Sequence, residues 1–186
     1  GLSKAIGEKL VIHADKHSQH TRFFVIRAGN ALGSNGSVVP HFINQIAFEN
    51  KVDITDERMT RYFLTLPEAV GLLITAAESK ISGGIFVTKM PAFKIVDIAK
   101  VLIELKGRKD TRINIIGIRQ GEKIHEMLVS EYESPQTYVY DNNYYLIHQD
   151  KQKLTKVKFT EYSSNTELSD RDGILNLLFK GGYITR

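Results

Sequence analysis

Residues 23–37 read FFVIRAGNALGSNGS, a short apolar run that leads directly into a loop of small and polar residues. The apolar run has the length and composition of a parallel strand that is buried on both faces. In residues 1–18, before this run, Leu2, Ile6 and Leu10 recur at helical spacing, which predicts an amphipathic helix with these side chains on its buried face. A helix, a buried strand and a glycine-rich loop in this order are typical of an α/β sheet that presents a ligand site at the carboxyl end of its strands.

Further helices and strands are predicted downstream of this loop. The helices are indicated by apolar residues at helical spacing, and they lie at residues 38–48, 66–79 and 95–105, between Lys123 and Leu128, and after a cap at Ser169. Short apolar runs that predict strands lie at residues 85–87 and 113–116. The buried stripe expected for the helix at 66–79 consists of Val70, Leu73, Ile74 and Ala77. The alternation predicts a mixed α/β fold.

The composition is that of an ordinary globular protein. Of the 186 residues, 42% are hydrophobic and 25% are charged, and the net charge is +4. The basic residues are scattered among 21 acidic ones, so no nucleic-acid-binding surface is expected. No run approaches the roughly 18 to 20 apolar residues that a membrane span needs. Cysteine is absent, which excludes disulfides and thiolate metal sites and fits a cytoplasmic protein.

Two arginines and a glutamate form a candidate site for a nucleoside diphosphate. Arg61 and Arg119 each offer a planar fork of donors that matches phosphate oxygens two at a time. The predicted helix after Arg119 would add backbone N–H groups for the same anion. Glu122 offers only acceptors, which suits the two hydroxyls of a ribose. On composition alone, surface ion pairs are the favoured explanation of the two arginines.

Three further candidates carry weaker signals. Lys4 lies off the apolar stripe of the first helix, as solvent-exposed lysines do. Gly29 permits a close approach of a ligand to the backbone and Asn30 can donate and accept, although a flexible turn has the same composition. His13 and His17 share one helical face, but no carboxylate pattern accompanies them, which favours a solvated helix end over a metal site.

Taken in order, the segments resemble a known family. Residues 26–40, IRAGNALGSNGSVVP, are similar to the RYGNVxxSRGSVIP segment of bacterial UDP-N-acetylglucosamine 4,6-dehydratases, which are extended short-chain dehydrogenases/reductases. The MTRYF of residues 59–63, the RQGEK of 119–123 and the EYSSNT of 161–166 resemble further motifs of the same enzymes. Residues 1–10 are similar to the helix that carries the lysine of their YxxxK motif. Any one of these motifs is modest, but the four at residues 26–40, 59–63, 119–123 and 161–166, in this order, are specific.

The resemblance implies roles in substrate binding. Asn30, Arg61 and Arg119 would hold the diphosphate of a UDP-sugar, and Glu122 would bind the uridine ribose. The other substrate-binding residues implied by it are Ser37 and Val38, which would face the sugar nucleotide, and Ile54, within residues 53–55 beside the uracil.

The resemblance also implies a nicotinamide cofactor, NADP or NAD. Lys4 is the implied catalytic residue, which binds the nicotinamide ribose and tunes proton transfer at the sugar 4-hydroxyl, while Ala28 and Gly29 would lie beside the cofactor. In the family, hydride leaves sugar C4, water is lost across C5 and C6, and the hydride returns to C6. Ala28 stands where the family has tyrosine, and no GxxGxxG loop for a dinucleotide is present. We therefore expect this chain to be inactive by itself.

The resemblance also implies the fold, the domain division and the function of the parent protein. We expect the carboxy-terminal part of a Rossmann-type fold, with residues 1–50 from the cofactor domain and residues 51–186 forming a substrate-binding domain with a carboxy-terminal extension. The parent protein would be a lyase of capsule or other surface-polysaccharide synthesis and a homo-oligomer. Two alternatives stay open: a nucleotide-sugar epimerase or reductase of the same family, and a non-catalytic nucleotide-sugar-binding module.

Overall fold

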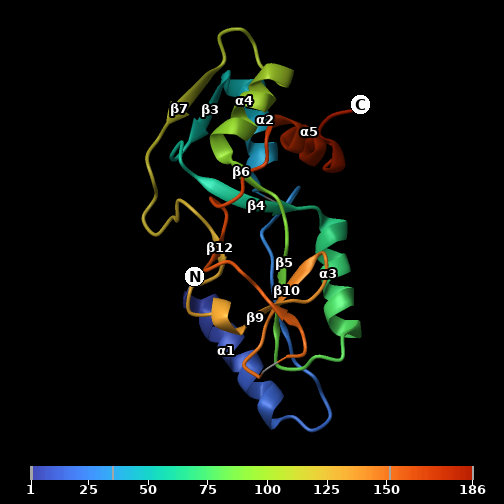
Figure 1. Ribbon diagram of the computed structural model, residues 1–186. Helices are drawn as coiled ribbons and strands as arrows, with labels where there is room; N and C mark the ends of the chain where they lie inside the picture. Colours follow the sequence, from blue (N-terminus) through green and yellow to red (C-terminus); the bar gives the residue numbers. More distant parts are fainter. Residues whose placement is uncertain (1, 35, 151, 186) are drawn as a thin grey trace. The chain divides into compact units, whose positions relative to one another are not determined.

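The computed structural model describes residues 2–34, 36–150 and 152–185, and it has a mixed α/β fold (Figure 1). Gly1, where the first helix was expected to begin, lies outside these residues. The chain forms two compact units, each built from segments that are distant in the sequence. Unit 1 comprises Gly1–Ala28, Pro67–Lys89 and Met127–Tyr162, and unit 2 comprises Gly29–Leu66, Met90–Glu126 and Ser163–Arg186. The compact units do not coincide with the expected functional division at residue 50, and that division stays a prediction.

Unit 1 is built around a five-stranded sheet with the order β1-β5-β10-β9-β11. Strand β1 runs parallel to β5, and the other neighbours are antiparallel. The strands are β1 (Val25–Arg27), β5 (Ile85–Thr88), β9 (Thr137–Val139), β10 (Tyr144–Ile147) and β11 (Thr155–Lys156). The unit also contains α1 (Leu2–His17), β8 (Met127–Val129), the 3-10 helix η1 (Ser134–Gln136) and nearly all of α3 (Leu66–Glu78). The two residues of β12 (Tyr162–Ser163) belong one to each unit.

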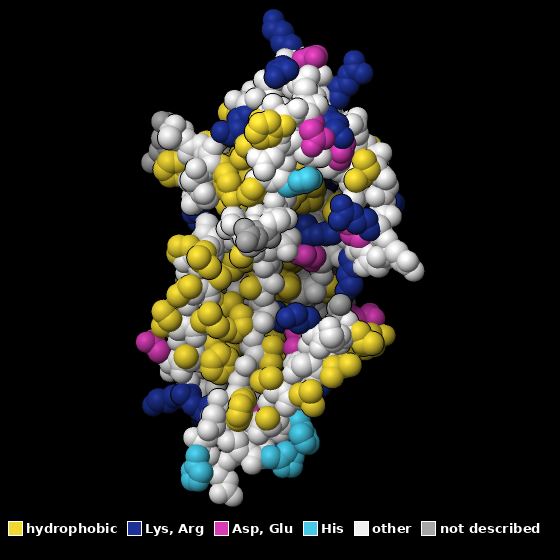
Figure 2. Space-filling view, turned by 180° about the vertical axis from the view of Figure 1, so that it is seen from behind, with side chains coloured by type: hydrophobic (Ala, Val, Ile, Leu, Met, Phe, Trp, Pro, Cys, Tyr) yellow, Lys and Arg dark blue, Asp and Glu magenta, His cyan; other side chains and the backbone are white. Residues whose placement is uncertain are grey.

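The two long helices of unit 1 do not bury their predicted faces. In α3, Leu72 and Ala76 pack on Phe86 of the sheet, whereas the predicted stripe that includes Leu73 and Ile74 is exposed. In α1, none of the described residues is buried, so the stripe expected there is exposed as well. Figure 2 shows the resulting apolar patches in the lower half of the view.

Unit 2 contains three helices and two small sheets. The helices are α2 (Val38–Glu49), α4 (Ile95–Lys106) and α5 (Arg171–Lys180). One sheet has the order β2-β4-β6, with β2 parallel and β6 antiparallel to β4, and the other pairs β3 with β7 in parallel. Their strands are β2 (Asn30–Ala31), β4 (Thr60–Leu64), β6 (Ala92–Lys94), β3 (Lys51–Ile54) and β7 (Arg112–Ile115).

The apolar stripes of the unit 2 helices are buried against one another. Phe42 of α2, Leu102 of α4 and Leu178 of α5 belong to one hydrophobic cluster. In α4, the apolar residues at helical spacing predict a buried face of Ile95, Ile98, Ala99, Leu102 and Leu105, and all of these except the exposed Leu105 are buried. Packing of this kind supplies most of the stability of a helix in water, which explains why these helices form where the sequence predicts them.

Two local predictions need correction. Residues 123–128 do not form a helix: residues 123–126 are irregular with a bend at 124 and 125, and residues 127 and 128 belong to β8. Helix α5 is capped by Asp170, whose Oδ1 accepts from the Gly173 N–H at 3.0 Å, and not by Ser169. No helix among the described residues has both the length and the apolar content to cross a membrane.

Candidate functional site

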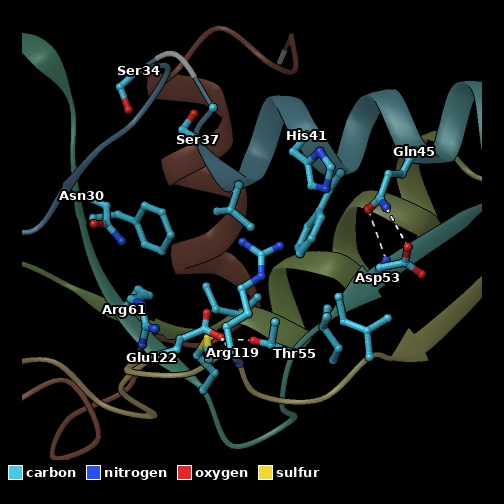
Figure 3. A pocket seen from close by; sticks show the side chains of 18 of the residues that line it. Asn30, Ser34, Ser37, His41, Gln45, Asp53, Thr55, Arg61, Arg119 and Glu122 are labelled. Carbon is cyan, nitrogen blue, oxygen red and sulfur yellow. Dashed lines mark hydrogen bonds between the residues drawn. The ribbon is translucent and has the colours of Figure 1, made fainter.

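A cavity of about 870 Å³ lies in unit 2 (Figure 3). Its walls come from the loop around β2, from one face of α2, from the ends of β3 and β4, and from the segment that follows β7. Predicted site residues that line it are Gly29, Asn30, Ser37, Val38, Ile54, Arg61, Arg119 and Glu122. The structure therefore brings together every predicted substrate-binding residue, although these residues are spread over almost a hundred positions of the chain.

A tight turn presents Arg119 and Glu122 to the cavity. Glu122 N–H donates to the Arg119 carbonyl oxygen at 3.0 Å, and the Glu122 carboxylate accepts from the Arg119 N–H at 3.1 Å. Gly121 adopts a φ of 79°, a conformation that most other residues avoid, and so permits the turn. The Arg119 side chain is exposed in the cavity (Figure 3), and its guanidinium has no hydrogen-bond or ion-pair partner among the described residues. It is therefore available to an anionic ligand.

Arg61 is held much more firmly than Arg119. Its side chain is only 13% exposed, and it donates to the carbonyl oxygens of Thr60 (2.7 Å), Ile124 (3.0 Å) and Lys123 (2.7 Å). Its Nε lies 3.6 Å from a carboxylate oxygen of Glu126. Burial raises the pKa of the Glu126 carboxyl, and the charge of Arg61 opposes this effect. Arg61 thus joins β4 to the segment that carries Glu122.

One face of α2 forms a polar wall. Ser37, His41, Gln45 and Glu49 recur at intervals of four and all line the cavity. The Ser37 Oγ atom is buried and has no hydrogen-bond partner among the described residues. The amino terminus of α2, at which Ser37 is the cap residue, opens on the same space. This amino terminus replaces the helix that was expected after Arg119 as a source of backbone N–H groups for an anion.

Gln45 and Asp53 form the opposite side of the cavity, across from Asn30 and Arg61 (Figure 3). Gln45, which is 4% exposed, donates to the Asp53 carboxylate at 3.1 Å and accepts from the Asp53 N–H at 3.1 Å. Hydrogen bonds from Lys51 above all, and also from Asn114, lower the pKa of Asp53 against the effect of its burial. The polar side chains at this end of the cavity therefore already bond to one another.

Gly29 is required by a close contact within unit 2. A Cβ atom at this position would lie 2.5 Å from Tyr62 Cβ and 2.9 Å from Met90 Sδ. The Gly29 N–H also points at Met90 Sδ, at 3.3 Å. The chain is therefore packed closely here, which differs from the flexible turn considered as an alternative.

Lys4 and Ala28 lie in unit 1 and do not line this cavity. Both are exposed. Lys4 is one helical turn before Glu8, whose carboxylate pairs with Arg27 at 2.7 Å. The Arg27 guanidinium also pairs with Glu133 at 2.7 Å. This arrangement, which we call the Arg27 clamp, fixes α1 to the sheet of unit 1 and thereby fixes the place of Lys4.

Four polar side chains that line the cavity were not predicted as ligands from the sequence: Ser34, His41, Gln45 and Glu49. The last three are polar residues spaced four apart along α2, which the sequence does show. This spacing alone does not show that a cavity lies beside that face of the helix. The rings of His13 and His17 lie in a tilted contact, with their centroids 4.4 Å apart. No group of three residues able to hold a metal ion occurs in the described parts of the chain.

The profile of the family described as "Polysaccharide biosynthesis protein" matches residues 1–148. The chain belongs to this family. It is 42% identical over 147 residues to the capsular polysaccharide biosynthesis protein CapD of Staphylococcus aureus. This match covers 77% of this chain and 24% of CapD. It is 40% identical over 147 residues to a UDP-N-acetylglucosamine 4,6-dehydratase (inverting) of Campylobacter jejuni, which covers 77% of this chain and 42% of that enzyme.

A UDP-glucose 4-epimerase of Rickettsia felis is 42% identical over 200 residues, covering 99% of this chain and 58% of that enzyme. Among solved structures, Pen from Bacillus thuringiensis superposes with a TM-score of 0.89 at 33% identity, over 100% of this chain and 58% of that one. The dTDP-glucose 4,6-dehydratase of Bacillus anthracis, with a TM-score of 0.54 at 18% identity, covers 63% of this chain and 39% of that one and shows the likeness of fold.

These comparisons confirm the family resemblance and the expected fold class. The fold is that of the extended short-chain dehydrogenases/reductases, a Rossmann-type group, and the chain spans less than two thirds of each of these relatives. The family includes nucleotide-sugar dehydratases and epimerases of polysaccharide synthesis.

Proposed function

We propose that the cavity of unit 2 binds a UDP-linked N-acetylhexosamine. We propose further that the full-length protein containing this chain is an NAD(P)-dependent nucleotide-sugar 4,6-dehydratase, a lyase that serves capsule or other surface-polysaccharide synthesis in the cytoplasm. The observation that carries the proposal is the guanidinium of Arg119, which has no partner among the described residues and lies in one cavity with the amino terminus of α2 and the Glu122 carboxylate.

The chemistry of the cavity suits such a ligand. Its volume of about 870 Å³ falls within the range of small-molecule sites in proteins. A diphosphate would sit between Arg119 and the first turn of α2, where Asn30 and Ser37 add hydrogen-bonding groups. The Glu122 carboxylate accepts from the two hydroxyls of the ribose. The backbone of residues 53–55 then borders the base.

The cofactor, NADP or NAD, would touch this chain at few places. Lys4 is exposed on α1 and the Arg27 clamp fixes the helix that carries it, so its ammonium group can donate to a cofactor ribose hydroxyl and hold a proton near a reacting hydroxyl. A bound nicotinamide supplies reversible uptake of hydride. The sequence holds no glycine-rich dinucleotide loop, so the rest of the cofactor site would belong to other parts of the protein.

A second candidate is a UDP-hexose 4-epimerase. The Rickettsia felis enzyme of that name matches almost the whole chain, whereas the match to the Campylobacter jejuni dehydratase covers 77% of it. The pairing of MTRYF with RQGEK favours the dehydratase. Mass spectrometry of the product of the full-length protein separates the two, because a dehydratase product is lighter by one water and an epimerase product has the mass of the substrate.

Calorimetric titration of this chain with UDP-N-acetylglucosamine tests the binding proposal. Arg119→Ala should weaken binding by about tenfold or more, which corresponds to about 1.4 kcal/mol. The matched control is Arg58→Ala, because Arg58 is exposed, pairs with its neighbour Asp56 and does not line the cavity. Equal affinity of the Arg119→Ala variant and the wild-type chain, or no binding by the folded wild type, would contradict the proposal.

A further inference from the structure

The two arginines of the cavity differ in how many donors they have free. A guanidinium carries five N–H groups. In Arg61, three of them donate to carbonyl oxygens and a fourth lies beside the Glu126 carboxylate. One N–H is left, which is too few for the two-point contact that makes arginine a strong phosphate ligand. Arg119 has no such partners among the described residues, so its whole fork is free.

The carbonyl groups that Arg61 binds belong to the segment directly after Glu122. Lys123 O and Ile124 O are adjacent in the chain, and Ile124 O also accepts from the Thr60 N–H at 3.0 Å. Three hydrogen bonds from two residues of β4 therefore hold this point of the chain. Because Glu122 and Arg119 bond to each other within their turn, a shift of residues 123 and 124 would move both ligand-facing side chains.

A buried polar network holds the chain on the far side of these carbonyls. The Thr60 hydroxyl lies 2.6 Å from Ser164 Oγ and 2.8 Å from His125 Nδ1. Ser164 Oγ accepts from the Glu126 N–H at 2.9 Å, and the Ser164 N–H donates to the Glu126 carbonyl oxygen at 2.8 Å. Thr60 and Ser164 are buried. The network therefore fixes residues 125 and 126 without the help of Arg61.

The segment before the turn has few anchors among the described residues. The Ile116 N–H donates to the Ile54 carbonyl oxygen at 2.9 Å, but the side chains of Ile116 and Ile118 are exposed, and Gly117 has a positive φ angle with open space around it. The turn of residues 119–122 thus lies between this exposed segment and residues 123 and 124, whose carbonyl groups Arg61 binds.

We propose that Arg61 is a positioning residue, which holds the turn of residues 119–122 in the geometry that binds the nucleotide sugar, while Arg119 makes the contact with the diphosphate. The inference rests on the proposed function and deepens it, because it divides the work between two arginines that the sequence presents as equivalent. Glu126 supports the arrangement by holding the Nε side of the guanidinium.

Hydrogen exchange of the unliganded chain tests the positioning role without any ligand. Arg61→Ala should speed exchange of the amides of residues 119–124 by roughly tenfold, since a local opening becomes easier. Arg61→Lys should restore little of the protection, because an ammonium lacks the planar fork that spans two adjacent carbonyls. Arg119→Ala and the Arg58→Ala control should exchange like the wild type. Should Arg61→Ala fail to fold, as judged by circular dichroism, Arg61→Lys carries the comparison.

The salt dependence of UDP-N-acetylglucosamine binding supplies the second readout. Both arginine variants should bind more weakly, but only Arg119→Ala should flatten the fall of affinity with rising salt, because it removes a charge that touches the ligand. Unchanged exchange in Arg61→Ala together with a flattened salt dependence would overturn the proposal and make Arg61 a direct ligand. Failure of the wild type to bind would refute the proposed function instead, and the exchange data would still decide whether Arg61 holds the turn.

Discussion

The helices of unit 1 and unit 2 carry similar apolar stripes but use them differently. In unit 2, the stripes of α2 and α4 are buried in a common core. In unit 1, the stripes predicted for α1 and α3 are exposed, although the helices themselves form as expected. The comparison teaches that helical periodicity predicts which face of a helix is fit for burial, but that the chain must also supply a surface to cover it.

The largest effect on stability is expected at two phenylalanines of α2, one buried and one exposed, which test whether burial determines the contribution of an apolar side chain. Phe42 is 2% exposed in the core of unit 2, whereas Phe48 is 86% exposed on the same helix. Phe42→Ala should lower the free energy of unfolding by about 3 to 5 kcal/mol, as loss of a buried aromatic ring does. Phe48→Ala should change it by less than about 0.5 kcal/mol. Urea denaturation measures both, and a similar loss in the two variants would show that this face of α2 is covered.

The Arg27 clamp of unit 1 is expected to give the next largest effect. Burial disfavours the ionised Glu133 carboxylate, but hydrogen bonds from Arg27 and Ser130 outweigh this and lower its pKa to about 2. A depressed folded-state pKa gives stability that is present above the unfolded value near 4.5 and is lost as the pH falls towards 2. The loss should be roughly 2 to 3 kcal/mol, and Glu133→Gln should flatten the dependence.

Denaturation curves collected between pH 6 and about pH 2 measure this contribution. The variant Glu131→Gln is the control, since Glu131 is an exposed neighbour. A wild-type stability that falls with the same slope as that of Glu133→Gln would contradict the role assigned to the clamp.

The smallest effect is predicted for the exposed stripe of α3. Ile74 is 53% exposed, so Ile74→Ala should lower stability by less than about 1 kcal/mol in this chain. Leu72→Ala, two residues earlier and fully buried, should cost about 2 to 5 kcal/mol. Thermal unfolding of the two variants compares them directly. A large loss for Ile74→Ala would mean that its face is packed, and the contrast between the units would not hold.

Much of the fold was predictable because it depends on local patterns. The helices at residues 38–48 and 95–105 and the strand at 113–116 lie within a residue or so of α2, α4 and β7. The segment at residues 123–128 was predicted wrongly, because its shape depends on contacts with Arg61 and Ser164, which are distant in the sequence. Long-range contacts of this kind override local propensity.

The candidate site, like the fold, was predictable where it depends on residue types and unpredictable where it depends on long-range contacts. Arg61, Arg119 and Glu122 could be proposed from residue chemistry and the family resemblance, and the fold does place them in one cavity. The different states of the two arginines could not be predicted, since they depend on which carbonyl groups the fold brings to Arg61. His41 and Gln45 were missed because only the packing of α2 decides which polar face borders the cavity.

A titration of the isotope-labelled chain with UDP-N-acetylglucosamine, followed by amide NMR, tests the central claim most directly. The account predicts that the largest shifts fall on cavity residues of unit 2, including Asn30, Val38, Thr55 and Glu122, and that they are lost in Arg119→Ala. Shifts confined to unit 1, or a spectrum that does not change at saturating ligand, would contradict the assignment of this cavity as a nucleotide-sugar site.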